Sequence, residues 1–96
     1  MGAKRFETYG RGRTAADAFA QAQEKARYAY GHAGYTGTIA EKESFALVPE
    51  PIPQGMTPEQ YAEQLCAEAL YTSKWGPCGA IAVTEGVWLF FGEASA

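Results

Sequence analysis

Residues 80–91 read AIAVTEGVWLFF, two short apolar runs separated by the pair Glu85-Gly86. A glycine-containing pair between two runs of β-forming residues is typical of a β-hairpin. The second run, from Val87 to Phe91, does not alternate between apolar and polar residues, so it supplies bulky side chains to both faces of a sheet. The outer face of a sheet in a two-layer fold normally meets water. We therefore expect something to cover the outer face of this hairpin.

Two further segments upstream of the hairpin are expected to be strands. The opening segment, Arg5 to Tyr9, alternates in polarity and contains β-forming residues. The residues from Thr36 to Val48 are also typical of a strand, but two glutamates share the phase of the apolar residues. We expect a bulge or a short turn from Glu41 to Ser44 to resolve this conflict.

Two helices are expected between these strands. Thr14 can cap a helix over residues 15–30, and Gly31 is placed to end it. Thr57 can cap a second helix that ends near Ser73, because a proline and a glutamine follow at its first and third positions. The expected buried residues are Ala18, Phe19, Ala22, Ala26, Ala29 and Tyr30 in the first helix, and Tyr61, Leu65, Cys66, Ala69 and Leu70 in the second.

The elements follow one another in the order β-α-β-α-β-β, without an internal repeat or a linker. This order predicts an α+β fold with a mainly antiparallel sheet and both helices on one face of it. The chain has 96 residues, of which 47% are hydrophobic. A chain of this length and composition is expected to form a single domain, residues 1–96, around one core.

The composition also bears on location and chemistry. No apolar run approaches the length of a transmembrane helix, and the first residues lack the apolar stretch of a signal peptide, so we expect a cytoplasmic protein without a membrane contact. Cys66 and Cys78 are expected to be reduced thiols, and a bridge between them is the open alternative. The sequence contains no complete catalytic motif and no metal-ligand pattern, so we expect no catalytic residue, no metal and no cofactor.

Charge is distributed unevenly along the chain. Residues 1–30 hold six basic and three acidic side chains, a net charge of +3, and residues 31–96 hold two basic and eight acidic, a net charge of −6. An acidic chain is a poor nonspecific binder of nucleic acid, because such affinity comes mainly from neutralised phosphates. A protein partner with a basic surface fits this charge better.

Two blocks of sequence are distinctive. The first is GYTGTIAEK, residues 34–42, and the second is KWGP, residues 74–77, followed by WLFFG at residues 88–92. With these blocks the chain resembles a group of small uncharacterised proteins of bacteria and their phages. The group has no assigned activity, so no functional residue is carried over. A phage setting would imply a small inhibitor of host defence, by analogy with other acidic α+β domains of this size.

The first functional hypothesis is a non-enzymatic protein-binding module, which in a phage would act inside the host cytoplasm as an inhibitor of a host defence system of the anti-CRISPR kind. Its binding surface would combine Trp88 and Phe90, on the outer face of the hairpin, with the acidic residues Glu59, Glu63 and Glu68. Aromatic anchors and complementary charges are what protein interfaces use. A homodimer that pairs the two hairpin faces is the simpler alternative.

The second hypothesis is a domain that binds a small ligand or nucleotide, with weak hydrolase activity as an extension. It would use Arg11, Arg13, His32, Tyr35 and Glu41. The two arginines could hold an anion near the start of the first helix, and the histidine could pair with Cys66 or Cys78 to activate a thiol nucleophile. This hypothesis predicts that the five residues converge on one concave pocket.

Overall fold

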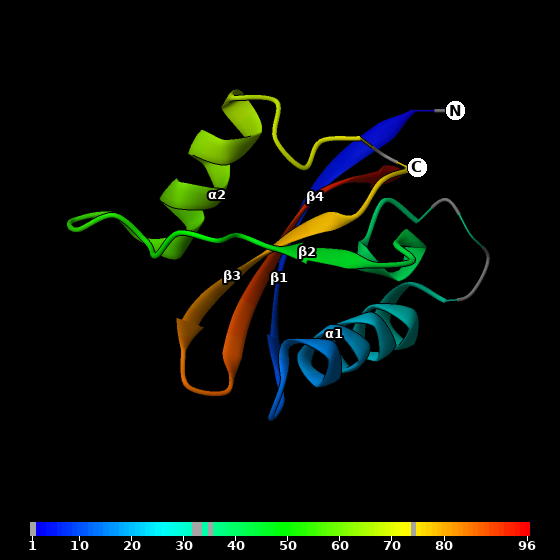
Figure 1. Cartoon of the computed structure of the whole chain (residues 1–96). Coiled ribbons are helices and arrows are strands. Elements are labelled where there is room, and N and C mark those ends of the chain that lie inside the picture. Colours follow the sequence, from blue (N-terminus) through cyan, green and yellow to red (C-terminus); the bar gives the residue numbers. More distant parts are fainter. Residues whose placement is uncertain (1, 32–33, 35, 74) are drawn as a thin grey trace.

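The computed structural model describes residues 2–31, 34, 36–73 and 75–96. They form β1 (Ala3–Arg11), α1 (Ala15–Tyr30), the single 3-10 turn η1 (Ile39–Glu41), β2 (Phe45–Leu47), α2 (Pro58–Ala67), β3 (Cys78–Thr84) and β4 (Val87–Ser95). The strands build one sheet in the order β1-β4-β3-β2 (Figure 1). β4 is antiparallel to both β1 and β3, whereas β2 is parallel to β3. The expected α+β class is confirmed, and the sheet is mixed.

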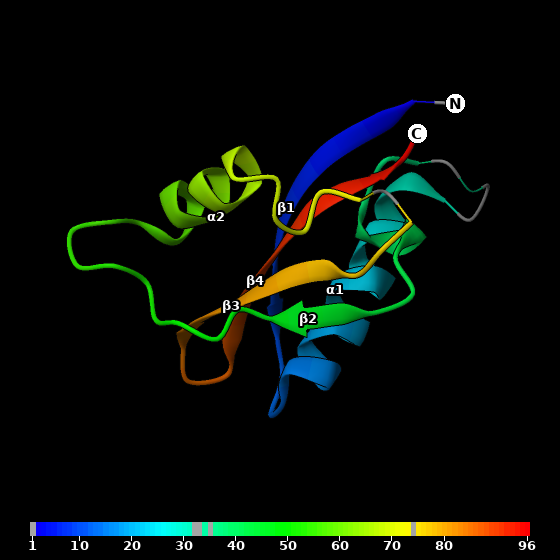
Figure 2. The same ribbon diagram turned by 45° about the horizontal axis from the view of Figure 1, so that its top comes forward.

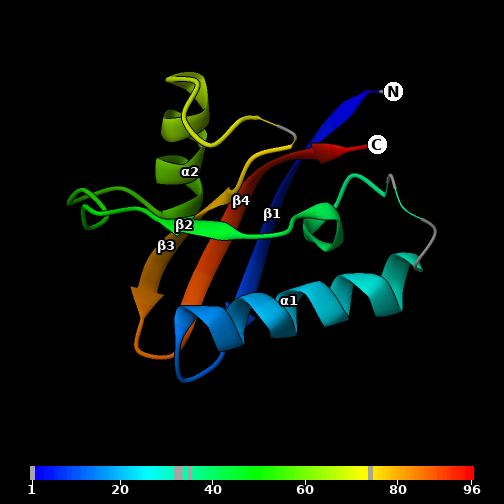
Figure 3. The same cartoon turned by 45° about the vertical axis from the view of Figure 1, so that its right-hand side comes forward.

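The two helices lie on opposite faces of the sheet (Figures 2 and 3). Phe90 and Ala80 point to the face that α1 covers, and Leu89, Phe91 and Ile81 point to the face that α2 covers. The prediction of both helices on one face is therefore wrong. Successive side chains of a strand point to opposite faces, so two apolar strands need a cover on each face. The expected outer face of the hairpin, which carries Trp88 and Phe90, is covered by α1, a segment of the same chain.

The core beneath α1 is built around three phenylalanine rings. The ring centroid of Phe90 lies 5.5 Å from that of Phe19 and 5.8 Å from that of Phe45, and Phe19 and Phe45 are 5.1 Å apart. Ala18 and Ala22 are fully buried in the same cluster. Small side chains on this stripe let the helix axis approach the sheet closely.

The ends of α1 agree with the sequence. The Thr14 hydroxyl oxygen accepts a hydrogen bond of 3.1 Å from the Asp17 N–H, and the Gly31 N–H donates to the Arg27 carbonyl at 2.8 Å. Gly31 has a φ of 86°, which favours glycine. The buried stripe ends earlier than predicted, because Ala29 and Tyr30 are exposed.

The start of α2 also agrees with the sequence, but its end does not. Thr57 and Gln60 form a reciprocal capping box around the first turn. The helix ends at Ala67 rather than near Ser73. Ala69 has a φ of 60°, which breaks the helical path, and the Leu70 side chain is 44% exposed. Ala69 and Leu70 are therefore not part of the buried stripe.

The segment from Thr36 to Val48 is mostly not a strand. Thr38 caps η1, whose Ile39 is fully buried, and only Phe45–Leu47 pairs with β3. The predicted turn between Glu41 and Ser44 thus begins two residues earlier, as η1. The Lys42 ammonium group donates to the Ser73 carbonyl at 2.8 Å and to the Gly76 carbonyl at 3.0 Å, which links this segment to the loop before β3.

Gly10 lies where α1 packs tightly against the sheet. A Cβ atom at this position would overlap the carbonyl oxygen of Ala18 and would lie 2.9 Å from Cε2 of Phe90. We expect Gly10→Ala to lower the free energy of unfolding by about 1–3 kcal/mol, because the helix must move off its buried stripe. Urea denaturation measures this change. Gly2→Ala is the matched control, since nothing lies within 4 Å of the added atom, and equal stability of the two variants would contradict the expectation.

Candidate functional site

The strand β1 is an edge strand of the sheet. One of its long sides pairs with β4, and the opposite long side pairs with no strand of the described chain. The Gly12 N–H donates to the Gly86 carbonyl at 3.1 Å, and the Ala96 N–H donates to the Gly2 carbonyl at 3.1 Å. Even-numbered residues of this strand therefore exchange hydrogen bonds with β4. In an antiparallel pair the bonding direction alternates from residue to residue. The N–H and C=O groups of the odd-numbered residues consequently point away from the sheet.

The carboxyl end of this edge is occupied by side chains from α1. The Arg11 N–H donates to Oε1 of Gln21 at 3.2 Å, and the Lys25 ammonium group lies 3.4 Å from the Tyr9 carbonyl oxygen. Both contacts involve odd-numbered residues and come from the open side, in agreement with the bonding pattern. In the described part of the chain no strand covers Ala3, Arg5 and Glu7 on that side. Such an exposed row of donors and acceptors is a template for pairing with another strand.

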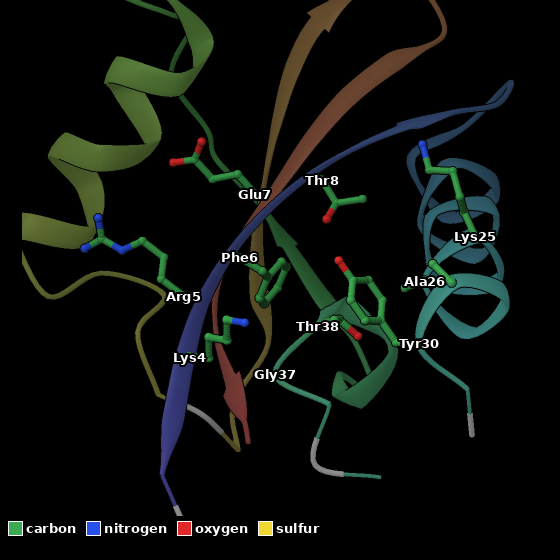
Figure 4. A pocket seen from close by; sticks show the side chains of 11 residues that line it. Lys4, Arg5, Phe6, Glu7, Thr8, Lys25, Ala26, Tyr30, Gly37 and Thr38 are labelled. Atoms are coloured by element: carbon green, nitrogen blue, oxygen red, sulfur yellow. The ribbon is translucent and has the colours of Figure 1, made fainter. Parts of the chain in front are cut away.

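A groove lies beside this edge, between β1 and the carboxyl half of α1 (Figure 4). Its volume is about 350 Å³. Phe6 and Thr8 point toward the α1 side, whereas Arg5 and Glu7 point toward α2 (Figure 4). The groove is lined by Lys4, Arg5, Phe6, Glu7, Thr8, Lys25, Ala26, Ala29, Tyr30, Gly37 and Thr38.

The α2 side of β1 is predominantly acidic. The Tyr9 hydroxyl donates a hydrogen bond to the Glu59 carboxylate, which raises the pKa of Tyr9 to about 12 and lowers the pKa of Glu59. Partial burial raises the pKa of Glu7, and the nearby carboxylates of Glu59 and Glu63 raise it further. The Arg5 guanidinium opposes this shift by lowering the Glu7 pKa. Glu7 therefore lies in a field in which negative charge exceeds positive charge.

The residues predicted to bind a protein occupy different environments. Phe90 is fully buried in the core beneath α1, and Trp88 is half-buried against the same cluster. The ring of Phe90 therefore does not reach the surface in this fold. Glu59, Glu63 and Glu68 are exposed on or at the end of α2. Of these three carboxylates, Glu59 and Glu63 act on the Glu7 carboxyl group at the free edge.

The described residues of the predicted ligand pocket do not converge. Arg11 is exposed at the end of β1, and Arg13 is exposed in the turn that follows. Glu41 accepts hydrogen bonds from the N–H and the hydroxyl group of Thr36, at 3.2 and 2.8 Å. The hollow that Glu41 lines with residues 42–43 and 75–76 includes neither arginine. The other two predicted members, His32 and Tyr35, lie outside the described residues.

The two cysteines are buried and are not bonded to each other. Burial raises the pKa of Cys78 to about 12 and also raises the pKa of Cys66, so both thiols hold their protons at neutral pH. Within the described residues, His, Cys, Asp and Glu side chains form no group of three or more that could hold a metal ion. The helices described are also too short or too polar to cross a membrane.

Comparison of the chain with models of protein families, with curated proteins and with solved structures found no match. The resemblance to small bacterial and phage proteins therefore stays a prediction. The free edge of β1 combines outward-facing backbone groups, a groove and charged side chains.

Proposed function

We propose that the chain is a non-enzymatic protein-binding module, and that its partner adds an extended strand to the free edge of β1. The observation that carries this proposal is the outward-facing row of backbone groups on Ala3, Arg5 and Glu7 beside the groove. Strand addition to an exposed sheet edge is a recurring mode of protein recognition, in which backbone hydrogen bonds supply affinity. The partner in this mode is a polypeptide.

The side chains that an added strand would contact differ between the two faces of β1. Side chains on one face of that strand would enter the groove, which is lined by Phe6, Lys4 and Lys25 among others. Side chains on the other face would meet Arg5 and Glu7, next to the carboxylates of α2. Alternate side chains of a strand point to opposite faces, so selectivity would follow a two-residue period.

The acidic residues of α2 have a supporting role in this proposal. Glu59 and Glu63 are exposed and lie close enough to β1 to shift the Glu7 pKa. Complementary charge at the rim of an interface mainly speeds association and orients the partner. We therefore expect partner binding to weaken at high salt, because exposed charges are screened over about 8–10 Å at physiological ionic strength.

Glu7→Pro tests the free edge directly. The Glu7 N–H points away from β4, so proline removes an outward donor and leaves the β1–β4 hydrogen bonds in place. We expect this variant to capture its protein partner at least about tenfold less than the wild-type chain does, because an added strand loses a bond and meets the proline ring. Quantitative mass spectrometry of tagged-chain pull-downs measures the change.

Glu7→Ala is the matched control, since it removes the carboxylate and keeps the N–H donor. It is expected to retain most of the captured partner, with a changed response to salt. The proposal fails if Glu7→Pro captures its partner as well as Glu7→Ala does. It also fails if the wild-type chain captures no polypeptide, including no second copy of itself.

A further inference from the structure

Arg5 and Glu7 combine two properties at the free edge of β1. Their backbone groups point outward, and their side chains lie on the same face of the strand, toward α2 (Figure 4). They carry opposite charges two residues apart. A second strand paired with this edge would therefore bring its own side chains directly beside one positive and one negative group.

Backbone geometry restricts how β1 can pair with the same strand of a second copy. Only odd-numbered residues present outward N–H and C=O groups, so an antiparallel partner must place odd-numbered residues opposite odd-numbered residues. One such register puts Arg5 of each copy opposite Glu7 of the other. Sliding the strands by two residues puts Arg5 opposite Arg5, or Glu7 opposite Glu7. Like charges that face each other directly destabilise a strand pair, which leaves the mixed register as the favoured one.

We propose that the strand added to the β1 edge belongs to a second copy of this chain, and that the two β1 strands pair antiparallel with Arg5 of each copy opposite Glu7 of the other. This inference rests on the proposed function, since it names the occupant of the same edge. The pairing obeys twofold symmetry, so each favourable contact occurs twice. It would join the two sheets into one continuous sheet.

The charge around Glu7 supports this occupant. Partial burial raises the Glu7 pKa, the carboxylates of Glu59 and Glu63 raise it further, and the Arg5 of the same copy offsets these carboxylates only in part. The Arg5 guanidinium of a second copy would bring further positive charge to this acidic side. In the isolated chain, Glu7 is surrounded by more negative than positive charge. A cation placed opposite Glu7 therefore stabilises its ionised carboxylate.

The side chains nearest the symmetry axis also fit this register. Phe6 would stand opposite Phe6 of the second copy on the α1 side, beside the groove. Lys4 would stand opposite Thr8, so like charges do not face each other on that side. The Lys25 contact with the Tyr9 carbonyl, at 3.4 Å, lies outside the central pairs, where Ala3 of the second copy would stand opposite Tyr9.

Charge reversal with recombination tests the register. Arg5→Glu places two carboxylates opposite each other in the dimer, and Glu7→Arg places two guanidinium groups opposite each other. We expect each variant alone to raise the dimer Kd by at least about tenfold relative to the wild type. An equimolar mixture of the two variants restores opposite charges in both central pairs, so we expect it to form a heterodimer. Sedimentation velocity at low ionic strength measures all of these species.

Arg13→Glu is the matched control, because it makes the same change of charge at an exposed residue of the turn after β1, outside the paired strands. We expect its dimer Kd to stay within about threefold of the wild-type value, since no residue of the second copy faces it in the proposed register. Circular dichroism checks that each variant is folded.

The outcomes separate this inference from the proposed function. A wild-type chain that stays monomeric, an unchanged dimer Kd for Arg5→Glu, or a mixture that forms no heterodimer overturns the pairing with a second copy. If the wild-type chain is monomeric but its binding of another protein is still lost in Glu7→Pro, the free edge keeps its function with a different occupant. If Glu7→Pro leaves all binding unchanged, including any dimer, both proposals fail.

Discussion

Phe90→Ala is expected to lower the free energy of unfolding by about 3–5 kcal/mol, a large share of the stability of a small domain. The Phe90 side chain has no exposed surface, and its ring packs against those of Phe19 and Phe45. Truncation removes these contacts and leaves a cavity that the surrounding sheet and helix cannot fill completely. Urea denaturation followed by circular dichroism measures the loss.

Tyr28→Ala is the control for this experiment. Tyr28 is also an aromatic residue, but its side chain is 94% exposed on α1, so its removal should change stability by no more than about 0.5 kcal/mol. The two variants also show how an alanine scan of this chain should be interpreted. If Phe90→Ala loses both stability and binding, the loss of binding reflects unfolding. If it loses binding while its stability is unchanged, Phe90 contacts the partner directly and must lie at the surface.

Alkaline pH is expected to destabilise the fold through Cys78. Burial raises the pKa of this thiol from 9.0 to about 12 in the folded chain. The unfolded chain releases the proton near pH 9 and the folded chain keeps it, so the folded state binds more protons between these values. The contribution of Cys78 to stability is therefore complete below pH 9 and falls by about 1.4 kcal/mol per pH unit up to about pH 12, on the order of 4 kcal/mol in total.

Cys78→Ala isolates this contribution. The variant is less stable at pH 8 because a buried group is lost, but its stability should fall less steeply above pH 9, by about 1.4 kcal/mol per pH unit. Urea denaturation in the presence of a reductant, at several values between pH 8.5 and 10.5, measures both slopes. Equal slopes for the variant and the wild-type chain would contradict the expectation. Slopes have to be compared because other groups also titrate in this range. Tyr9, Tyr61 and Cys66 have raised pKa values and act in the same direction as Cys78. Lys42 has a lowered pKa and acts in the opposite direction.

The starts of both helices could be predicted from sequence because they depend on neighbouring residues. Thr14 and Thr57 each accept a hydrogen bond from a backbone N–H three residues later, and Pro58 fits the first helical position without losing a bond. The hairpin around Glu85-Gly86 is equally local. Such contacts form between residues that the chain already holds close together, so the sequence pattern contains them.

The end of α2 and the segment before β2 could not be predicted in the same way. The periodicity of α2 continues to Leu70, but the chain turns away at Ala69, where φ is 60°. Ile39 fits a strand by its propensity and is instead buried in a 3-10 turn against α1. In both places tertiary packing outweighs local preference, which is weak for short segments.

The candidate site could not be predicted from sequence patterns either. In the sequence, Arg5 and Glu7 are ordinary polar positions of an alternating strand, although charged side chains are common on edge strands. Whether that strand is an edge depends on its neighbours. β1 pairs with β4, the last strand of the chain, and no short-range pattern indicates a contact between residues so far apart in sequence.

The sequence by itself therefore determined the α+β class, the caps of both helices and the hairpin of β3 and β4, because each depends on short-range hydrogen bonds or on local alternation. Only the tertiary structure decided that the helices cover opposite faces and that β1 forms a free edge next to a groove. The physical reason is that apolar side chains on both faces of β4 require burial on both sides, and the pairing of distant strands sets which elements supply it.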